Sequence, residues 1–270
     1  MKLELTYSEL CSQLNGKSVG VPFVDLIQEV VYDTRKINPS AGLVFFALTG
    51  PFRQGESYIS AAYEKGVRVF VVHQVPVNKW SDASFIVVKD TLVALQLLAK
   101  NYRNKLEYPI LAIAGSLGKT TVKEWLYHLL AGKLEVFRSP KSYNSQLGVA
   151  ISILQLPKKA DLAIIEVAAT KPGEMNVLAD MLRPTHGILT NLLSSHANEF
   201  SDFTQYSQEI CSMFLGVQWL ITPEETETIA QLSVKKISIL PNALDSLIPF
   251  QDDSSILQSK IAIAAAEEWI

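Results

Sequence analysis

The chain has 270 residues, of which 48% are hydrophobic, and its formal net charge is -3 at pH 7. This length favours two domains over one, and the composition is that of a globular protein rather than a disordered chain. The charge balance argues against a nucleic-acid partner, and no run approaches the roughly 18 apolar residues that a membrane span needs.

The cysteines and the N-terminus point to a cytoplasmic protein. Cys11 and Cys211 are far apart and do not have the spacing of a zinc or disulfide framework. Such usage fits a reducing compartment, where both residues act as buried apolar side chains. The first residues contain no apolar segment of the kind found in signal peptides.

The first third of the chain predicts a small α/β domain. Short apolar runs typical of strands occupy residues 30–34, 42–48, 67–73 and 84–89, and one clear helix is expected over 58–66. A longer helical pattern follows over 90–106, capped by Asp90 or Thr91. We expect this helix to lead into a second domain, so the predicted domains are 1–106 and 107–270.

The remainder alternates regularly between strands and helices. Strands are expected at 110–115, 135–139, 162–168, 187–191, 219–222 and 235–240, with helices from Lys119, near Gln146, from Gly173 and around Tyr206. Apolar strands separated by helices favour a doubly wound parallel sheet that is buried on both faces. A last helix, capped by Ser254 or Ser255, is expected to run to Ile270 without a glycine or proline stop.

Residues 112–125, AIAGSLGKTTVKEW, join an apolar run to an amphipathic one through a glycine-rich loop. A strand that enters a helix through such a loop directs backbone N–H groups and the helix N-terminus at phosphate. Gly115 and Gly118 allow the close turn, Lys119 would contact the β and γ phosphates, and Thr120 would offer its hydroxyl to Mg²⁺. The core face of the helix is expected to consist of Val122, Trp125, Leu126, Leu129 and Leu130.

The phosphate-loop motif at this position is specific but incomplete. The longer phosphate-loop pattern needs a glycine where Ile113 stands, so only the shorter pattern G-x-x-G-K-T is present. An ordinary tight turn that happens to precede a lysine therefore stays open as the alternative.

The loop resembles that of the Mur ligases, ATP-dependent amide-forming enzymes of peptidoglycan synthesis, which reads G-[ST]-x-G-K-[ST]-[ST]. The segments YNSQLGV (143–149), KPGEM (171–175), RPTHGILTNL (183–192) and SSH before ANEF resemble the MurF branch, notably its form fused to alanine racemase. That branch joins UDP-N-acetylmuramoyl-tripeptide to D-alanyl-D-alanine. Residues 32–50, YDTRKINPSAGLVFFALTG, resemble the N-terminal domain that holds the uridine nucleotide.

The resemblance implies a role for each matching residue. Lys119, Glu166 and His196 are the candidate catalytic residues, and Thr120 and Glu166 are the candidate Mg²⁺ ligands. The ATP site would comprise Gly115, Ser116, Gly118, Lys119, Thr120, Thr121 and Asn144, and the uridine-diphosphate site Asp33, Thr34 and Arg35. A carboxylate at the carboxyl edge of a parallel strand is also where topology alone puts a ligand site. Glu166 as a solvated strand-end acid, His196 as a locally packed residue, and an Asp33–Arg35 pair across a turn remain alternatives.

Several positions depart from the family pattern. Leu117 replaces a small or polar loop residue, and Ile210 stands where relatives carry a lysine that becomes carbamylated and supplies a metal-directed carboxylate. Gln54 and Glu56 alter the substrate-domain motif, and Glu56 would repel a nearby pyrophosphate. We also expect the third domain of the family to be absent from this chain, so that it would have to be supplied in trans.

These observations leave three functional hypotheses. The first is a partial or degenerate ATP-dependent ligase that works through an acyl phosphate. The second is a catalytically silent nucleotide- or muramyl-nucleotide-binding protein that acts through a partner; Ile210 favours it. The third, an unrelated phosphate-loop kinase, does not account for the residues from Tyr32 to Gly50.

Overall fold

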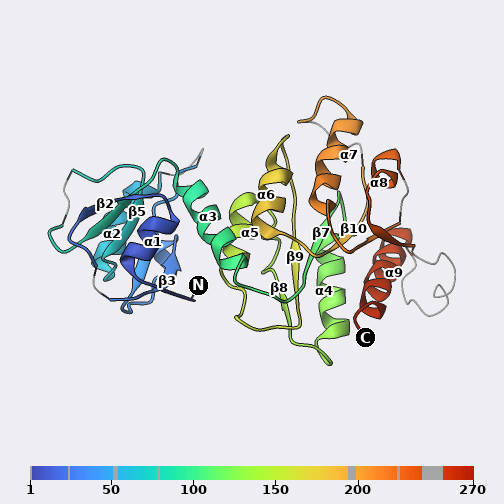
Figure 1. Cartoon of the computed structure of the whole chain (residues 1–270), viewed down its shortest axis with the longest axis horizontal. Coiled ribbons are helices and arrows are strands. Elements are labelled where there is room, and N and C mark those ends of the chain that lie inside the picture. The colour runs from blue at the N-terminus through green and yellow to red at the C-terminus, as the bar shows by residue number, and fades with distance from the viewer. Residues whose placement is uncertain are drawn as a thin grey trace. The chain divides into compact units, whose positions relative to one another are not determined.

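The computed structural model describes residues 2–23, 25–50, 54–77, 80–193, 199–223, 226–238 and 252–270. The chain divides into two compact units, Met1–Tyr102 and Arg103–Ile270 (Figure 1). The boundary expected from the sequence lies a few residues further along, between residues 106 and 107. Each unit has its own sheet.

Unit 1 is built on a mixed sheet with strand order β1-β3-β4-β5-β6-β2. The strands are β1 (Lys2–Leu5), β2 (Lys17–Gly20), β3 (Ile27–Val31), β4 (Leu43–Phe46), β5 (Val69–Val72) and β6 (Ser84–Val87). The central pairs are parallel, whereas β1 and β2 pair antiparallel at the two edges. The four predicted strands are confirmed, but β3 runs from Ile27 to Val31, so the strand expected over 30–34 lies three residues too far along the chain.

The helices of unit 1 are α1 (Tyr7–Gln13), α2 (Ile59–Glu64) and α3 (Thr91–Arg103), with 3-10 turns η1 (Thr34–Lys36) and η2 (Gly55–Tyr58). The sequence interpretation missed α1, although Thr6 and Glu9 form a capping box at its start. Asp90 caps α3 as expected, since its carboxylate accepts from the N–H groups of Leu92 and Val93.

Unit 2 contains a sheet with strand order β12-β11-β10-β7-β9-β8, in which every pair is parallel. The strands are β7 (Ile110–Ala114), β8 (Val136–Arg138), β9 (Leu162–Glu166), β10 (His186–Leu189), β11 (Trp219–Thr222) and β12 (Lys235–Ser238). The helices are α4 (Lys119–Leu130), α5 (Gln146–Ile153), α6 (Glu174–Leu182), α7 (Phe203–Cys211), α8 (Glu227–Ala230) and α9 (Asp253–Glu267), with a 3-10 turn η4 (Ser212–Phe214). The doubly wound parallel sheet is therefore confirmed.

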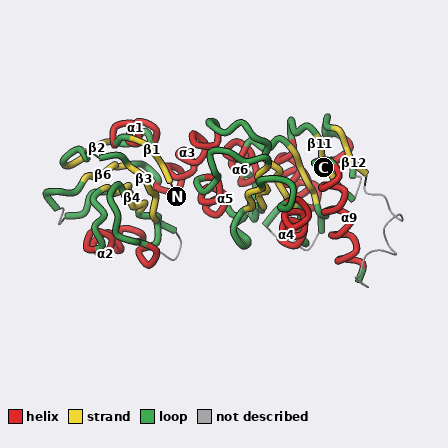
Figure 2. Tube along the Cα trace, turned by 90° about the horizontal axis from the view of Figure 1, so that it is seen from below, coloured by secondary structure: helices red, strands yellow, loops and turns green. Residues whose placement is uncertain are grey.

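Strand parity decides which side chains face α4 and α9, which lie side by side in unit 2 (Figure 2). Successive residues of a strand point to opposite faces. Leu162 and Ile164 of β9 pack with the inner faces of α4 and α9 in one buried cluster. Glu166 is two residues further on, so the same parity turns its side chain toward α4.

Two helix details differ from the expectation. Leu129, expected on the core face of α4, is 45% exposed, because it borders a groove between α4 and α9 instead of the sheet. The N-cap of α9 is Asp252, whose carboxylate accepts from the N–H of Ser255, and the helix ends at Glu267. Neither Ser254 nor Ser255 is the cap, because the helix begins at Asp253 and the Asp252 carboxylate accepts the capping hydrogen bond.

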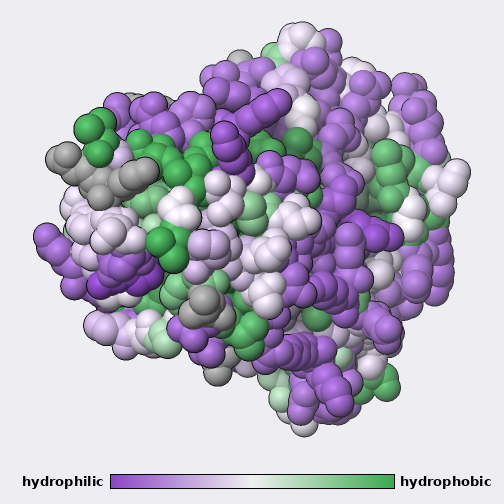
Figure 3. Space-filling view, turned by 60° about the vertical axis from the view of Figure 1, so that its left-hand side comes forward, coloured by the Kyte–Doolittle hydropathy of each residue, from purple (hydrophilic) through white to green (hydrophobic). Residues whose placement is uncertain are grey.

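On the face drawn in Figure 3, hydrophilic side chains cover most of the surface and hydrophobic ones form separate small groups. The large apolar side chains that are more than half exposed, Val21, Val77, Val93, Leu215 and Ile270, belong to different parts of the chain. Scattered apolar residues of this kind are normal on protein surfaces. Among the described residues, no helix is long and apolar enough to cross a membrane.

Candidate functional site

The phosphate-type loop connects β7 to α4 at the carboxyl edge of the parallel sheet (Figure 1). Gly115 and Gly118 have φ angles of +128° and +81°, a region that L side chains rarely adopt. A Cβ on Gly115 would also collide with the Thr190 hydroxyl and lie 2.8 Å from the Asn191 carbonyl oxygen. The loop therefore requires glycine for both conformation and space.

The end of β10 holds the crown of the loop in place. The hydroxyl of Thr190 donates to the Leu117 carbonyl at 2.6 Å, and the N–H of Leu117 donates to the side-chain oxygen of Asn191 at 2.9 Å. The Ser116 hydroxyl lies 2.9 Å from the hydroxyl of Tyr206 in α7. The Leu117 side chain is half exposed and makes none of these bonds, so leucine at this position is compatible with an ordered loop.

Lys119 folds back under the loop. Its ammonium donates to the carbonyl oxygens of Gly115 and Ser116 at 2.7 and 3.0 Å. Burial lowers the pKa of Lys119, and the nearby Glu166 carboxylate opposes this change. The ammonium thus lies within the turn that a phosphate would enter. Thr121 is half-buried in the first turn of the same helix.

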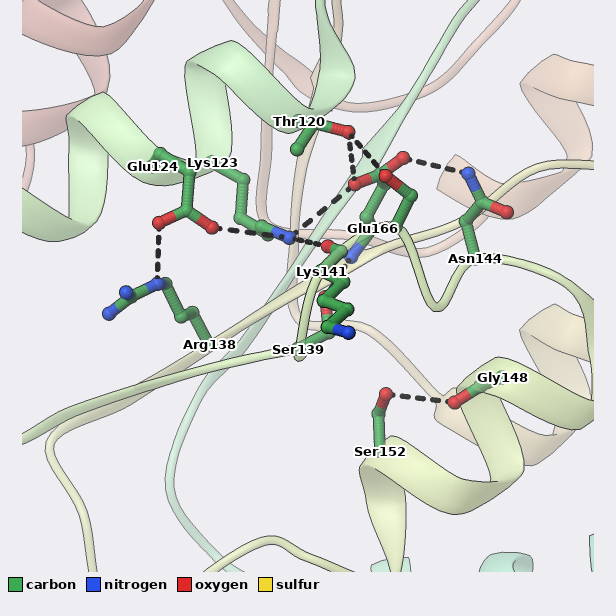
Figure 4. A network of polar contacts seen from close by, with 11 residues as sticks. Thr120, Lys123, Glu124, Arg138, Ser139, Lys141, Asn144, Gly148, Ser152 and Glu166 are labelled. Carbon is green, nitrogen blue, oxygen red and sulfur yellow. Dashed lines mark hydrogen bonds and ion pairs between the residues drawn. The ribbon is translucent and has the colours of Figure 1, made fainter.

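Glu166 is the centre of a buried polar network (Figure 4). Only 1% of this residue is exposed, and its two carboxylate oxygens accept from different donors. Oε2 accepts from the Thr120 hydroxyl at 2.8 Å, and Oε1 accepts from the Asn144 amide at 2.7 Å. The interpretation of Glu166 as a solvated strand-end acid is therefore wrong.

The donor set fits a Mg²⁺ ion that arrives with a phosphate. Mg²⁺ favours hard oxygen ligands, and in nucleotide sites it uses one or two carboxylates, substrate phosphates and water. Thr120 and Glu166 provide one hydroxyl and one carboxylate in direct contact. Among the residues that the structure describes, no three His, Cys, Asp or Glu side chains form a group able to hold a metal by themselves.

Two residues that the sequence analysis missed lie at this site. Lys123 is completely buried, and its ammonium is 3.5 Å from Glu166 Oε2. Gln258 of α9 lies against the loop, since a Cβ on Gly118 would be 2.7 Å from its amide nitrogen. Position i+3 from Thr120 could have indicated Lys123, because residues three apart share a helix face. No local signal indicates Gln258, which only the packing of α9 brings to the loop.

The Asp33-Thr34-Arg35 motif of unit 1 forms the turn η1 after β3. The Asp33 carboxylate accepts from the Arg35 guanidinium at 2.9 and 2.8 Å and from the Arg35 backbone N–H at 3.0 Å. These bonds lower the pKa of Asp33 to about 2. The Arg35 side chain is 77% exposed. The structure therefore contains the Asp33–Arg35 pair across a turn that the sequence analysis gave as an alternative. The arginine side chain nevertheless faces solvent.

A cavity of about 380 Å³ also lies in unit 1, near the carboxyl ends of β4, β5 and β6. It is lined by Thr49, Gln54, Glu56, His73, Gln74, Lys89, Asp90 and Thr91. The altered positions Gln54 and Glu56 are thus part of one cavity. The Glu56 carboxylate already accepts from the Gln74 backbone N–H at 3.2 Å.

The remaining site predictions concern the region around α7. His196 lies outside the described residues. Ile210 is 2% exposed, so its side chain is part of the packed interior. The neighbouring Glu209 carboxylate accepts from the Met175 N–H at the start of α6, at 2.7 Å. Isoleucine offers no ligand for a hard cation.

Comparison with known proteins agrees with these features. Residues 113–246 match the Mur ligase middle domain. A UDP-N-acetylmuramoyl-tripeptide–D-alanyl-D-alanine ligase of Synechocystis sp. is 36% identical over 172 residues, which are 63% of this chain and 37% of that enzyme. This chain spans half or less of the length of the curated relatives that it matches.

Solved structures share the fold. The fold matches MurF of Acinetobacter baumannii with a TM-score of 0.84 at 20% identity, covering 98% of this chain and 65% of that one. MurF of Thermotoga maritima, solved in complex with ADP, matches with a TM-score of 0.76 at 20% identity, covering 89% and 63%. The match of residues 113–246 to the Mur ligase middle domain argues against an unrelated phosphate-loop kinase. The chain belongs to the Mur ligase family and resembles its MurF branch.

Proposed function

We propose that unit 2 binds an adenine nucleotide together with Mg²⁺, and that the protein is an ATP-dependent ligase of peptidoglycan precursor synthesis in the cytoplasm. The observation that carries the proposal is the contact between the Thr120 hydroxyl and the buried Glu166 carboxylate, directly behind a loop that encloses the Lys119 ammonium. The name of the Synechocystis relative and the ADP complex of the Thermotoga protein support the proposal.

In this proposal the loop residues hold the triphosphate. The backbone N–H groups of the first turn of α4 and the Lys119 ammonium would neutralise phosphate charge as it develops. The binding set is the one predicted from the sequence: Gly115, Ser116, Gly118, Lys119, Thr120, Thr121 and Asn144. Thr120 and Glu166 would hold Mg²⁺, and Asn144 would orient Glu166.

The substrates would be UDP-N-acetylmuramoyl-tripeptide and D-alanyl-D-alanine. The terminal carboxylate of the tripeptide would take the γ-phosphoryl group of ATP, which leaves ADP and an acyl phosphate. The amine of D-alanyl-D-alanine would then attack the acyl carbon, so that inorganic phosphate leaves and the amine loses a proton. In unit 1, Asp33, Thr34 and Arg35 would bind the uridine diphosphate, and His196 remains a predicted catalytic residue.

A hydroxamate assay tests the ligase directly. The chain is incubated with ATP, Mg²⁺ and UDP-N-acetylmuramoyl-tripeptide, and hydroxylamine traps any acyl phosphate. The assay is run with and without the remaining domain of a MurF relative. We expect ADP release that depends on the tripeptide. Hydroxamate should form in the same molar amount as ADP. Failure of ATP–Mg²⁺ to bind the chain at all would contradict the whole proposal.

A second candidate is a catalytically silent nucleotide-binding protein that acts through a partner. The observation that favours it is Ile210, which is buried and apolar at the position where the family resemblance implies a carbamylated lysine. This candidate predicts ATP–Mg²⁺ binding without hydroxamate under any of the assay conditions. The same experiment therefore separates the two functions.

A further inference from the structure

Lys123 is a lysine in an unusual position. It lies in α4, three residues after Thr120, and its side chain has no exposed surface. A buried ammonium is costly unless opposite charge and hydrogen-bond acceptors surround it. The sequence pattern that identifies the phosphate loop gives Lys123 no role.

Three different parts of unit 2 surround the Lys123 ammonium (Figure 4). It lies 3.5 Å from Glu166 Oε2 at the end of β9 and 3.4 Å from Glu124 Oε1 of its own helix. It also donates a hydrogen bond to the carbonyl of Lys141. The ammonium therefore ties α4 and β9 to the segment that follows β8.

The segment after β8 carries two further groups of the site. Lys141 has a φ angle of +49°, a left-handed conformation that costs free energy for a residue other than glycine. Directly after it, the Ser142 hydroxyl lies 3.3 Å from the Thr120 hydroxyl. Asn144 donates to Glu166. The hydrogen bond from Lys123 thus holds this turn where Ser142 and Asn144 meet Thr120 and Glu166.

We propose that Lys123 is a positioning residue for the Mg²⁺ of the nucleotide site. It holds Glu166 and the turn at Lys141 in fixed positions, so that the oxygen ligands are arranged before the cation arrives. Preorganisation of this kind strengthens binding of the group that uses the arrangement, and leaves other contacts unchanged. The inference rests on the proposed nucleotide-binding function.

The test is calorimetric titration with ADP in the presence of Mg²⁺ and again in EDTA. The ratio of the two affinities measures the coupling between metal and nucleotide, and we expect it to be at least about tenfold in the wild-type chain. Lys123→Met keeps the length of the side chain and removes the charge. We expect the ratio to be at least about fivefold smaller in this variant than in the wild type. Its affinity for ADP in EDTA should stay within about twofold of the wild-type value.

Lys133→Met is the matched control, because Lys133 is an exposed residue just beyond α4 and should keep the wild-type ratio. An unchanged ratio in Lys123→Met, or equal weakening of ADP with and without Mg²⁺, would overturn the positioning role. If Lys123→Met does not fold, the same ratio in Lys123→Gln, which also removes the charge but keeps hydrogen-bonding groups, decides: a reduction supports positioning, and an unchanged ratio overturns it. No ADP binding by the wild-type chain would instead overturn the proposed function.

Discussion

Glu166 in unit 2 and Asp33 in unit 1 are both carboxylates beside the carboxyl end of a parallel strand, yet their surroundings differ. Glu166 is 1% exposed and has bonds from Thr120 and Asn144 on separate elements. Asp33 accepts hydrogen bonds from Arg35, two residues away, whose side chain is 77% exposed. The first acid is held by tertiary structure and the second by its own turn.

This difference determines what each charge contributes. A buried charge that loses its partner remains unpaired in a medium of low polarity, whereas an exposed one is solvated at once. The network around Glu166 should therefore affect both folding and ligand binding. The Asp33–Arg35 pair should affect stability little, and its arginine stays available to a ligand.

The largest loss of stability is expected for Glu166→Gln. The variant keeps a similar shape but leaves the buried Lys123 ammonium without its strand-end partner. We expect the free energy of unfolding to fall by about 3 kcal/mol, the lower end for a broken buried pair, because Glu124 remains nearby. Urea unfolding measures the change. Asp33→Asn is the comparison in unit 1 and should cost clearly less, because the Arg35 side chain that it leaves unpaired is 77% exposed. Equal losses in the two variants would remove the distinction.

The next effect concerns the backbone of the loop. Gly115→Ala places a Cβ against Thr190 and Asn191 at a φ angle of +128°. We expect a loss of about 2 kcal/mol in the free energy of unfolding, together with loss of ADP binding. Gly132→Ala is the matched control, since a Cβ there meets nothing within 4 Å. A Gly115→Ala variant that is as stable as this control would show that the loop is not constrained.

A smaller effect is expected for Tyr206→Phe. This change removes the hydroxyl that lies 2.9 Å from the Ser116 hydroxyl, while the ring stays buried. We expect thermal or urea unfolding to report a loss of about 1 kcal/mol, the usual value for one buried hydrogen bond. Phe203→Leu, at a side chain of α7 that is 40% exposed, serves as the comparison and should change stability less. If both changes cost the same, the hydroxyl does not anchor the loop.

The smallest effect on stability is expected for Arg35→Ala, because solvent screens a pair whose arginine side chain is 77% exposed. The pKa of Asp33 is lowered from 3.8 to about 2, chiefly by the Arg35 side chain. The pair therefore contributes stability above the ordinary pKa of the carboxyl group, and this contribution is lost as the pH falls through the lowered value. In Arg35→Ala the pKa should rise toward 3.8, which NMR titration of the Asp33 carboxyl measures. An unchanged pKa would mean that Arg35 does not set it.

The sequence predicts the framework of unit 2 because its strands are continuous apolar runs. Parity then places Glu166 on the same face as Leu162 and Ile164, toward α4. The helix α1 was missed because its apolar pattern is short, although the Thr6–Glu9 capping box marks its start. A search for capping boxes would have found it.

The sequence does not predict which polar groups of the site are buried. Lys123 is charged, and periodicity alone assigns charged residues to a solvent face. It is buried because Glu166, 43 residues later in the chain, offers a carboxylate at the end of β9. Leu129 is exposed for the complementary reason, since α9 packs beside it rather than over it. Such outcomes depend on contacts between distant segments.

The central claim is that unit 2 holds the adenine nucleotide through Lys119 and the Glu166 network. Calorimetric titration of ATP with Mg²⁺ into the wild type, Lys119→Ala and Arg35→Ala tests this claim most directly. We predict affinity at least about tenfold weaker for Lys119→Ala, because one charge-assisted contact to phosphate is lost, and affinity within about twofold of wild type for Arg35→Ala. Equal affinity in the wild type and Lys119→Ala would contradict the claim, since the loop would then be only a turn.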